Sequence, residues 1–254
     1  MAAKRPPHRA YFLKNGDRVK SVTTVIGNNL GWGKSGLMGW SRKIAMAGGD
    51  PNVIRDAAGD FGTNVHAMIE QQERGPEFKR DKSLPEIDAE AMGRAAKCVA
   101  GYQRWKDRIG FQCLENGIEL PLVSETHKYG GTIDMVGTFP KIHEALDDAG
   151  RPAAYSMDLD DRELTIVDFK TSNRMGPEMR IQLAAYAHLY EEVTGAPIRA
   201  GILHLGKTPN LADPEYPPWY PMRNLDREWA AFLVLLDLDR LQKDLDPFDQ
   251  EDAG

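Results

Sequence analysis

The sequence predicts an α/β protein in which a central mixed β-sheet is flanked by helices. Apolar residues recur at helical spacing over 86–109 and again over 178–194, which predicts two long amphipathic helices. Strand-like runs follow each of these helices, at 112–125, 129–138, 163–170 and 200–205. The resulting order, αβββαβ, is typical of a sheet with helices packed against its faces.

The N-terminal part predicts a hairpin followed by short helices. Residues 11–20 alternate in polarity around Asn15-Gly16, a strong signal for a β-hairpin. Residues 21–26 continue as a strand or open a helix, and the pattern does not decide between them. Further helices are expected at 35–47, 52–58, 62–73 and, near the C-terminus, 225–243.

The length fits one large domain or two small ones, and one domain is our interpretation because we find no repeat and no long linker. We divide it into a basic N-terminal extension, a core, a C-terminal helical part and an acidic, disordered tail, at 1–58, 59–210, 211–243 and 244–254. Residues 140–162 are rich in Asp, Gly and Pro and are expected to form an exposed excursion.

Charge and cysteine content exclude several classes. No run approaches the roughly 20 apolar residues of a membrane span, and the basic N-terminus lacks the apolar segment of a secretory signal. Only two cysteines are present, so an iron–sulfur cluster is excluded and a reducing cytoplasm is expected. Residues 1–43 carry +9 − 1 = +8, which leaves −6 − 8 = −14 for the remainder. A locally basic region on an acidic body suits a protein that grips a phosphate backbone.

Two strands carry charged groups where core residues would otherwise be expected. In the strand that ends at Lys170, side chains alternate, so Asp168 and Lys170 share one face while Val167 and Phe169 share the other. Asp134 lies on a second strand. Two carboxylates beside an amine indicate a metal-and-lysine site suited to Mg²⁺-dependent cleavage of a phosphodiester. The alternative is a solvated ion pair and a turn residue.

One apparent motif fails. Gly33-Lys34-Ser35 matches the end of a phosphate-binding P-loop, but that motif needs a glycine where Asn28 stands. We therefore exclude an ATPase.

Five ordered segments resemble the PD-(D/E)XK nuclease superfamily, and specifically its RecB-type and phage-type exonucleases. They are Gly62–His66, Glu125, Gly131–Asp134, Val167–Ser172 and Gln182–Tyr186, and the resemblance covers roughly residues 60–205. It implies a restriction-endonuclease-like fold with an N-terminal hairpin and helical extension. The implied activity is metal-dependent DNA exonuclease cleavage in recombination, repair or phage DNA processing.

The resemblance also implies a ligand set. The metal ligands would be His66, Asp134, Asp168 and the backbone carbonyl of Phe169. The expected ion is Mg²⁺, for which Mn²⁺ would substitute. For His66 the alternative is a helix-face histidine with an ordinary hydrogen bond. The glycines before Asp134 would let substrate backbone approach closely.

Lys170 would orient or deprotonate the attacking water and stabilise charge on the phosphate. Glu125 would support a second ion or a water, although a plain strand-edge acid is an equally good interpretation.

Four further residues would contact DNA. Gln182 and Tyr186 are one helical turn apart and project from the same side of their helix. Thr171 and Ser172 would donate to phosphate oxygens. The alternatives are a polar seam on an amphipathic helix and the end of a strand.

DNA is the expected partner, with a recombinase, a single-strand-binding protein or a helicase as candidate protein partners and no membrane. We expect a cytoplasmic protein, in a bacterial host or phage-encoded. Two other functions stay open: a non-cleaving DNA-binding module on the same scaffold, and an endonuclease specific for sequence or structure.

Overall fold

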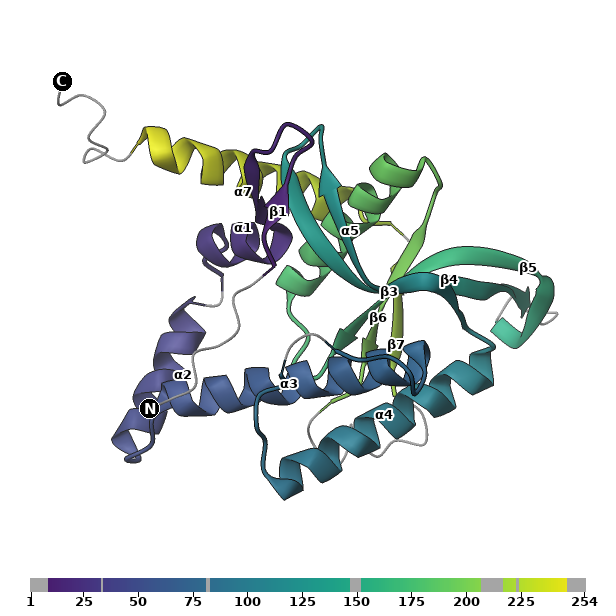
Figure 1. Cartoon of the computed structure of the whole chain (residues 1–254), viewed down its shortest axis with the longest axis horizontal. Coiled ribbons are helices and arrows are strands. Elements are labelled where there is room, and N and C mark those ends of the chain that lie inside the picture. The colour runs from purple at the N-terminus through teal and green to yellow at the C-terminus, as the bar shows by residue number, and fades with distance from the viewer. Residues whose placement is uncertain are drawn as a thin grey trace.

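The computed structural model describes residues 9–32, 34–80, 83–146, 152–206, 217–222 and 224–245 (Figure 1). The first residues of the basic extension and the acidic tail from residue 246 onward lie outside the described residues. The helices are α1 Val22–Asn29, α2 Lys34–Met46, α3 Pro51–Arg74, α4 Ala89–Ile109, α5 Pro177–Thr194 and α7 Asp226–Asp244. The strands are β1 Tyr11–Phe12, β2 Arg18–Ser21, β3 Gln112–Ser124, β4 Tyr129–Leu146, β5 Pro152–Lys170, β6 Arg199–His204 and β7 Trp219–Met222.

The seven strands form one mixed sheet whose centre is β4. β3 pairs antiparallel with the first half of β4, and β5 pairs antiparallel with β4 from Met135 onward. β6 joins β5 in parallel, while β2 joins the start of β4 in parallel. Among the described residues, no helix has both the length and the apolar content needed to cross a lipid bilayer.

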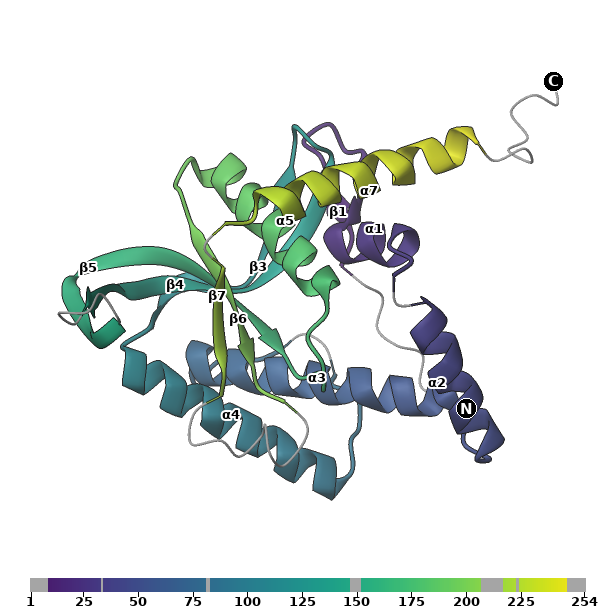
Figure 2. The ribbon, with the colours of Figure 1, turned by 180° about the vertical axis from the view of Figure 1, so that it is seen from behind.

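Helices cover both faces of the sheet, as Figures 1 and 2 show from opposite sides. On one face, α3 and α4 bury Val65, Tyr102 and Trp105 against Val167 and Phe169 of β5. On the other face, α1, α5 and α7 pack against the sheet, with the fully buried side chains Val22, Leu183, Phe232, Ile133 and Ile166. Each face thus has its own apolar core, which confirms a mixed α/β architecture with helices flanking a sheet.

Local sequence explains where several helices begin and end. The Ser21 hydroxyl accepts a hydrogen bond from the Thr24 amide at 3.1 Å, so the undecided segment 21–26 starts a helix. Asp88 caps α4 in the same way through the Ala91 amide at 2.7 Å. Gly110 ends α4 in the left-handed conformation, φ 65°, which favours glycine.

Two expectations about secondary structure are wrong. The helices expected at 52–58 and 62–73 form the single helix α3, because neither Gly59 nor Gly62 interrupts the hydrogen-bonded backbone and Phe61 between them is buried. The C-terminal part is not purely helical, since β7 pairs antiparallel with β6.

The strands expected at 129–138 and 163–170 are longer than predicted, whereas the exposure expected for residues 140–162 stays a prediction. β4 and β5 extend through it as one long antiparallel hairpin, paired from Met135↔Val167 out to Leu146↔Pro152, with register shifts after Pro140 and Ala145. Figure 1 shows this hairpin projecting from the body. Backbone pairing on both sides of these shifts gives the polar segment a regular structure.

Candidate metal and lysine site

A cavity of about 690 Å³ lies where α1, α3 and α5 meet the sheet. Its wall combines acids, bases and small residues: Thr23, Ala58, Gly59, Gly62, Thr63, His66, Ala67, Arg80, Glu119, Thr132, Asp134, Lys170, Thr171 and Gln182. Of the predicted site residues, this wall contains His66, Asp134, Lys170, Thr171 and Gln182.

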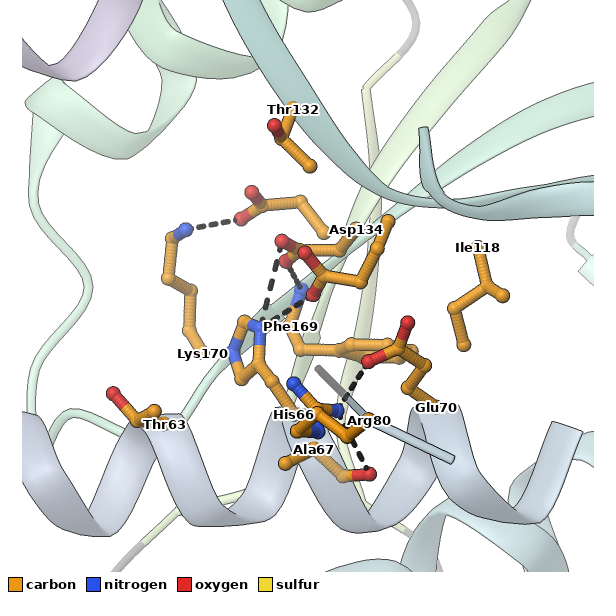
Figure 3. A network of polar contacts seen from close by, with 12 residues as sticks. Thr63, His66, Ala67, Glu70, Arg80, Ile118, Thr132, Asp134, Phe169 and Lys170 are labelled. Carbon is orange, nitrogen blue, oxygen red and sulfur yellow. Dashed lines mark hydrogen bonds and ion pairs between the residues drawn. The ribbon is translucent and has the colours of Figure 1, made fainter. Parts of the chain in front are cut away.

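Three half-buried side chains in the cavity form a possible metal-binding group. One donor atom from each of His66, Glu119 and Asp134 lies within 4.8 Å of the other two. The His66 Nδ1 atom is 3.5 Å from Asp134 Oδ1 and 4.0 Å from Glu119 Oε1. Figure 3 shows His66 reaching from the helix towards Asp134 on the sheet.

His66 and Asp134 are held by their surroundings. Val65 and Ile69, beside His66 in α3, are fully buried, so they fix the helix against the sheet. The His66 ring also meets the Phe169 ring edge-on at 5.6 Å. The Phe169 amide donates to Asp134 Oδ2 at 2.8 Å, which fixes the carboxylate.

Glu119 reaches the cavity because β3 is irregular. The β3–β4 register shifts between Cys113 and Ile118, and Glu119 itself has φ 50°. A positive φ is uncommon for a residue with a side chain, and such strain gathers at functional sites. Arg74 Nη2 donates to the Ile118 carbonyl at 2.9 Å and so ties the irregular segment to α3.

Asp168 and Lys170 form a buried ion pair beside this group. Lys170 Nζ lies 2.6 Å from Asp168 Oδ2, and the Asp168 residue is fully buried. In the described part of the chain, neither Asp168 oxygen has a hydrogen-bond partner besides this contact with Lys170. A buried carboxylate with one ion-pair partner keeps unsatisfied lone pairs, so a further cation would stabilise it. Asp168 is not a member of the group of three formed by His66, Glu119 and Asp134.

The pKa shifts follow from burial and close charges. Burial lowers the pKa of His66, but the neighbouring Asp134 outweighs it, and the pKa of His66 is about 9. Burial raises the pKa of Glu119 to about 7, and Asp134 adds to this rise. Burial also raises the pKa of Asp168 to about 6, against the opposing effect of Lys170. For Asp134, His66 overcomes burial and lowers the pKa. Burial and the nearby Asp134 thus disfavour the ionised form of Glu119, which a bound cation would favour.

Gln182 and Tyr186 connect α5 to the lysine. Lys170 Nζ donates to Gln182 Oε1 at 3.4 Å, and Gln182 Nε2 donates to the Tyr186 hydroxyl at 3.0 Å. Tyr186 is only 4% exposed and lies behind Gln182, outside the cavity wall. A Cβ added at Gly131 would lie 2.6 Å from Tyr186 Cε1. Hence in this structure the glycine makes room for a tyrosine ring of the protein itself.

Of the remaining predicted residues, one lines the cavity and two do not. Thr171 lines the cavity, close to Gly62, where an added Cβ would lie 3.1 Å from Thr171 Oγ1. Ser172 donates to the Arg174 carbonyl at 2.9 Å and does not line the cavity. Glu125 lies outside the cavity wall, where its carboxylate accepts from the Lys14 amide at 2.9 Å.

Sequence reasoning missed Glu119 and Arg80. The strand expected at 112–125 holds Glu115, Glu119 and Glu125, and nothing in its pattern distinguishes the acid that enters the site. The available signal was Gly117, where an added Cβ would lie 2.2 Å from the Val136 carbonyl. A glycine inside a strand indicates a bulge, and a bulge can redirect the next side chain.

The donor set suits a hard or borderline divalent ion. Ligands about 2.1 Å from Mg²⁺ stand roughly 3 to 4 Å apart, close to the separations found among these donor atoms. Fold and site together define a mixed α/β protein with a carboxylate–imidazole group that could hold a divalent metal beside a buried lysine.

A scan against models of protein families finds no match. A search of curated proteins finds no relative. Among solved structures, the chain is similar to a "putative exonuclease" from Eubacterium rectale, at 11% identity and a TM-score of 0.39. The similarity covers 73% of this chain and 65% of that one, and it is too distant to support an argument about activity.

Proposed function

We propose that this protein is a metal-dependent nuclease that hydrolyses phosphodiester bonds in DNA. The observation that carries the proposal is one cavity that contains both the His66–Glu119–Asp134 group and Lys170, paired with Asp168. Metal ligands next to an amine suit phosphodiester hydrolysis, because a metal ion and an ammonium both stabilise the charge that grows on the phosphate as water attacks.

Each residue then has a role. His66, Glu119 and Asp134 would hold Mg²⁺ or Mn²⁺, and Asp168 would face the ion from β5. When bound, the metal supplies charge that polarises the phosphate and lowers the pKa of bound water. Lys170, which contacts both Asp168 and Gln182, would orient the attacking water and donate to a phosphate oxygen. Its pKa is raised, because its carboxylate neighbours outweigh burial, so it is charged in the metal-free protein.

The other predicted residues support this lysine or the substrate. Tyr186 fixes the Gln182 amide, which in turn positions Lys170. Thr171 offers a hydroxyl to a phosphate from the cavity wall. The carbonyl of Phe169 and the hydroxyl of Ser172 stay proposed contributors, and Glu125 would act only at a distance.

Within this class, we propose an exonuclease of the RecB or phage type on a restriction-endonuclease-like core, acting in the cytoplasm on DNA in recombination, repair or phage DNA processing. The order of α4, β3, β4, β5, α5 and β6 supports the core, because it matches the expected αβββαβ order.

The test is a nuclease assay on end-labelled linear DNA and closed circular DNA, with Mg²⁺, Mn²⁺ or a chelator. We expect metal-dependent loss of the linear substrate only. Lys170→Ala and Asp134→Asn should each lower the rate about a hundredfold or more, the scale of lost acid–base and electrostatic catalysis. Lys97→Ala, at an exposed lysine of α4, is the matched control and should leave the rate unchanged.

Three results would change the assignment. Activity that survives in both site variants would refute the proposed site. Cleavage of closed circles would identify an endonuclease. Metal and DNA binding without cleavage, measured by calorimetry, would identify a non-cleaving module.

A further inference from the structure

Arg80 lines the cavity but has no role in the proposed hydrolysis. It follows α3 and lines the same wall as His66 and Glu119. Its side chain is 28% exposed, so it is accessible from the cavity without being a freely solvated surface arginine. Figure 3 shows it beside His66, Ala67 and Glu70.

The guanidinium is anchored at one nitrogen. Arg80 Nη2 donates to the Ala67 carbonyl at 3.3 Å and to the Glu70 carboxylate. The Glu70 side chain is 8% exposed, so this anchor is rigid. Within the described part of the chain, Nη1 and Nε of Arg80 make no hydrogen bond, which leaves donors for a ligand.

Charge counting favours an anionic ligand. Glu70 accepts from Arg80 and also from Arg74, whose Nε is 3.0 Å away. One carboxylate between two guanidinium groups leaves one positive charge in excess at this anchor. Glu119, on the same wall, is the other acid that faces Arg80, and a bound metal would neutralise that carboxylate. Arg74 does not line the cavity and stacks over the Phe78 ring at 4.9 Å, so the part of this charge that faces the cavity is Arg80.

We propose that Arg80 binds a second phosphate of the DNA strand, next to the phosphate that is cleaved. This inference rests on the proposed function and adds the means by which the strand is positioned. An arginine held at one edge presents its remaining donors in a fixed plane, the geometry that matches phosphate oxygens. Arg80 lines the same cavity as the metal-binding group. The phosphate that it binds is therefore expected to be adjacent to the cleaved phosphate in the strand.

The experiment compares cleavage of oligonucleotides in which one linkage near the cut site is a methylphosphonate, which removes that linkage's charge. In the wild type, one flanking methylphosphonate should raise KM about tenfold or more, as expected when a charged hydrogen bond is lost. Arg80→Gln should show the same loss on ordinary DNA and should no longer respond to that methylphosphonate. Arg80→Lys should recover part of the affinity because it keeps the charge.

Arg94→Gln is the matched control, because it removes an arginine of α4 that pairs with Glu90 and does not line the cavity, and it leaves the cavity arginine in place. It should keep the wild-type response to methylphosphonates. The metal concentration for half-maximal rate distinguishes phosphate binding by Arg80 from a structural role. If Arg80→Gln displaced Glu119, the variant would need more metal. Arg80→Gln should need no more than the wild type.

The outcomes are distinct. An Arg80→Gln enzyme that responds to every methylphosphonate as the wild type does overturns the phosphate site and leaves the nuclease assignment intact. A higher metal requirement in Arg80→Gln also overturns it, in favour of a structural arginine. A wild type that cleaves no DNA with any metal overturns both proposals.

Discussion

Gly131→Ala should displace Tyr186 and thereby weaken both stability and catalysis. The added Cβ would lie 2.6 Å from Tyr186 Cε1, 3.1 Å from Cδ1 and 3.4 Å from Val22 Cγ2. Carbon atoms in contact normally stand about 3.5 to 4.0 Å apart, so the ring must move by roughly 1 Å. Tyr186 is 4% exposed and has buried neighbours, so the shift cannot be absorbed by solvent.

The expected cost is that of overpacking a buried site, about 1–3 kcal/mol of unfolding free energy. The effect should reach Lys170, because Tyr186 holds Gln182 and Gln182 accepts from the lysine. A catalytic group misplaced by about 1 Å can lower the rate about a hundredfold.

Urea unfolding followed by fluorescence measures the first effect, and the nuclease assay measures the second. Gly93→Ala in α4 is the control, because an added Cβ there meets nothing within 4 Å. It should stabilise the helix by about 0.5–1 kcal/mol and leave activity unchanged. If Gly131→Ala is as stable and as active as Gly93→Ala, the packing argument is wrong.

Three further predictions concern the site and its support. The pKa of His66, about 9, exceeds its usual value of about 6.5, so its contribution to stability is complete below pH about 6.5 and is lost as the pH rises through 9. The melting temperature of the metal-free protein should therefore fall from pH 7 to 9, while the rise in melting temperature on adding Mn²⁺ should grow; a flat profile would contradict this. Glu119→Gln should weaken Mn²⁺ binding, measured by calorimetry, by at least the roughly tenfold loss seen for outer-shell groups, whereas Glu125→Gln should leave it unchanged. Tyr102→Phe should destabilise the protein by about 1–3 kcal/mol in urea unfolding, because its buried hydroxyl donates to Glu73 at 2.8 Å; an unchanged midpoint would show that the bond contributes nothing.

The long amphipathic elements could be predicted because their signal lies within the element itself. The helix expected at 86–109 is Ala89–Ile109, and the one expected at 178–194 is Pro177–Thr194. The strand Trp219–Met222 was missed because it is short, contains a proline and gains its identity only by pairing with β6.

The site divides in the same way. Asp168 and Lys170 could be placed on one face, because strand alternation is local, and the structure pairs them at 2.6 Å. Glu119 was missed because its direction depends on a bulge in the pairing of β3 with β4, and Gly117 indicates such a bulge without showing which acid it turns inward. The position of the Arg80 side chain likewise depends on an ion pair, which joins the segment after α3 to Glu70 within that helix.

The N-terminal hairpin lies unexpectedly close to the start of the strand that carries Asp134. Tyr11 occupies the space above Gly130, where an added Cβ would lie 2.3 Å from its ring, and its hydroxyl is 2.8 Å from Thr132 Oγ1. The hairpin therefore acts as a brace for that strand. A bulky tag or fusion that levers the hairpin away would be expected to impair metal binding while leaving every ligand in place.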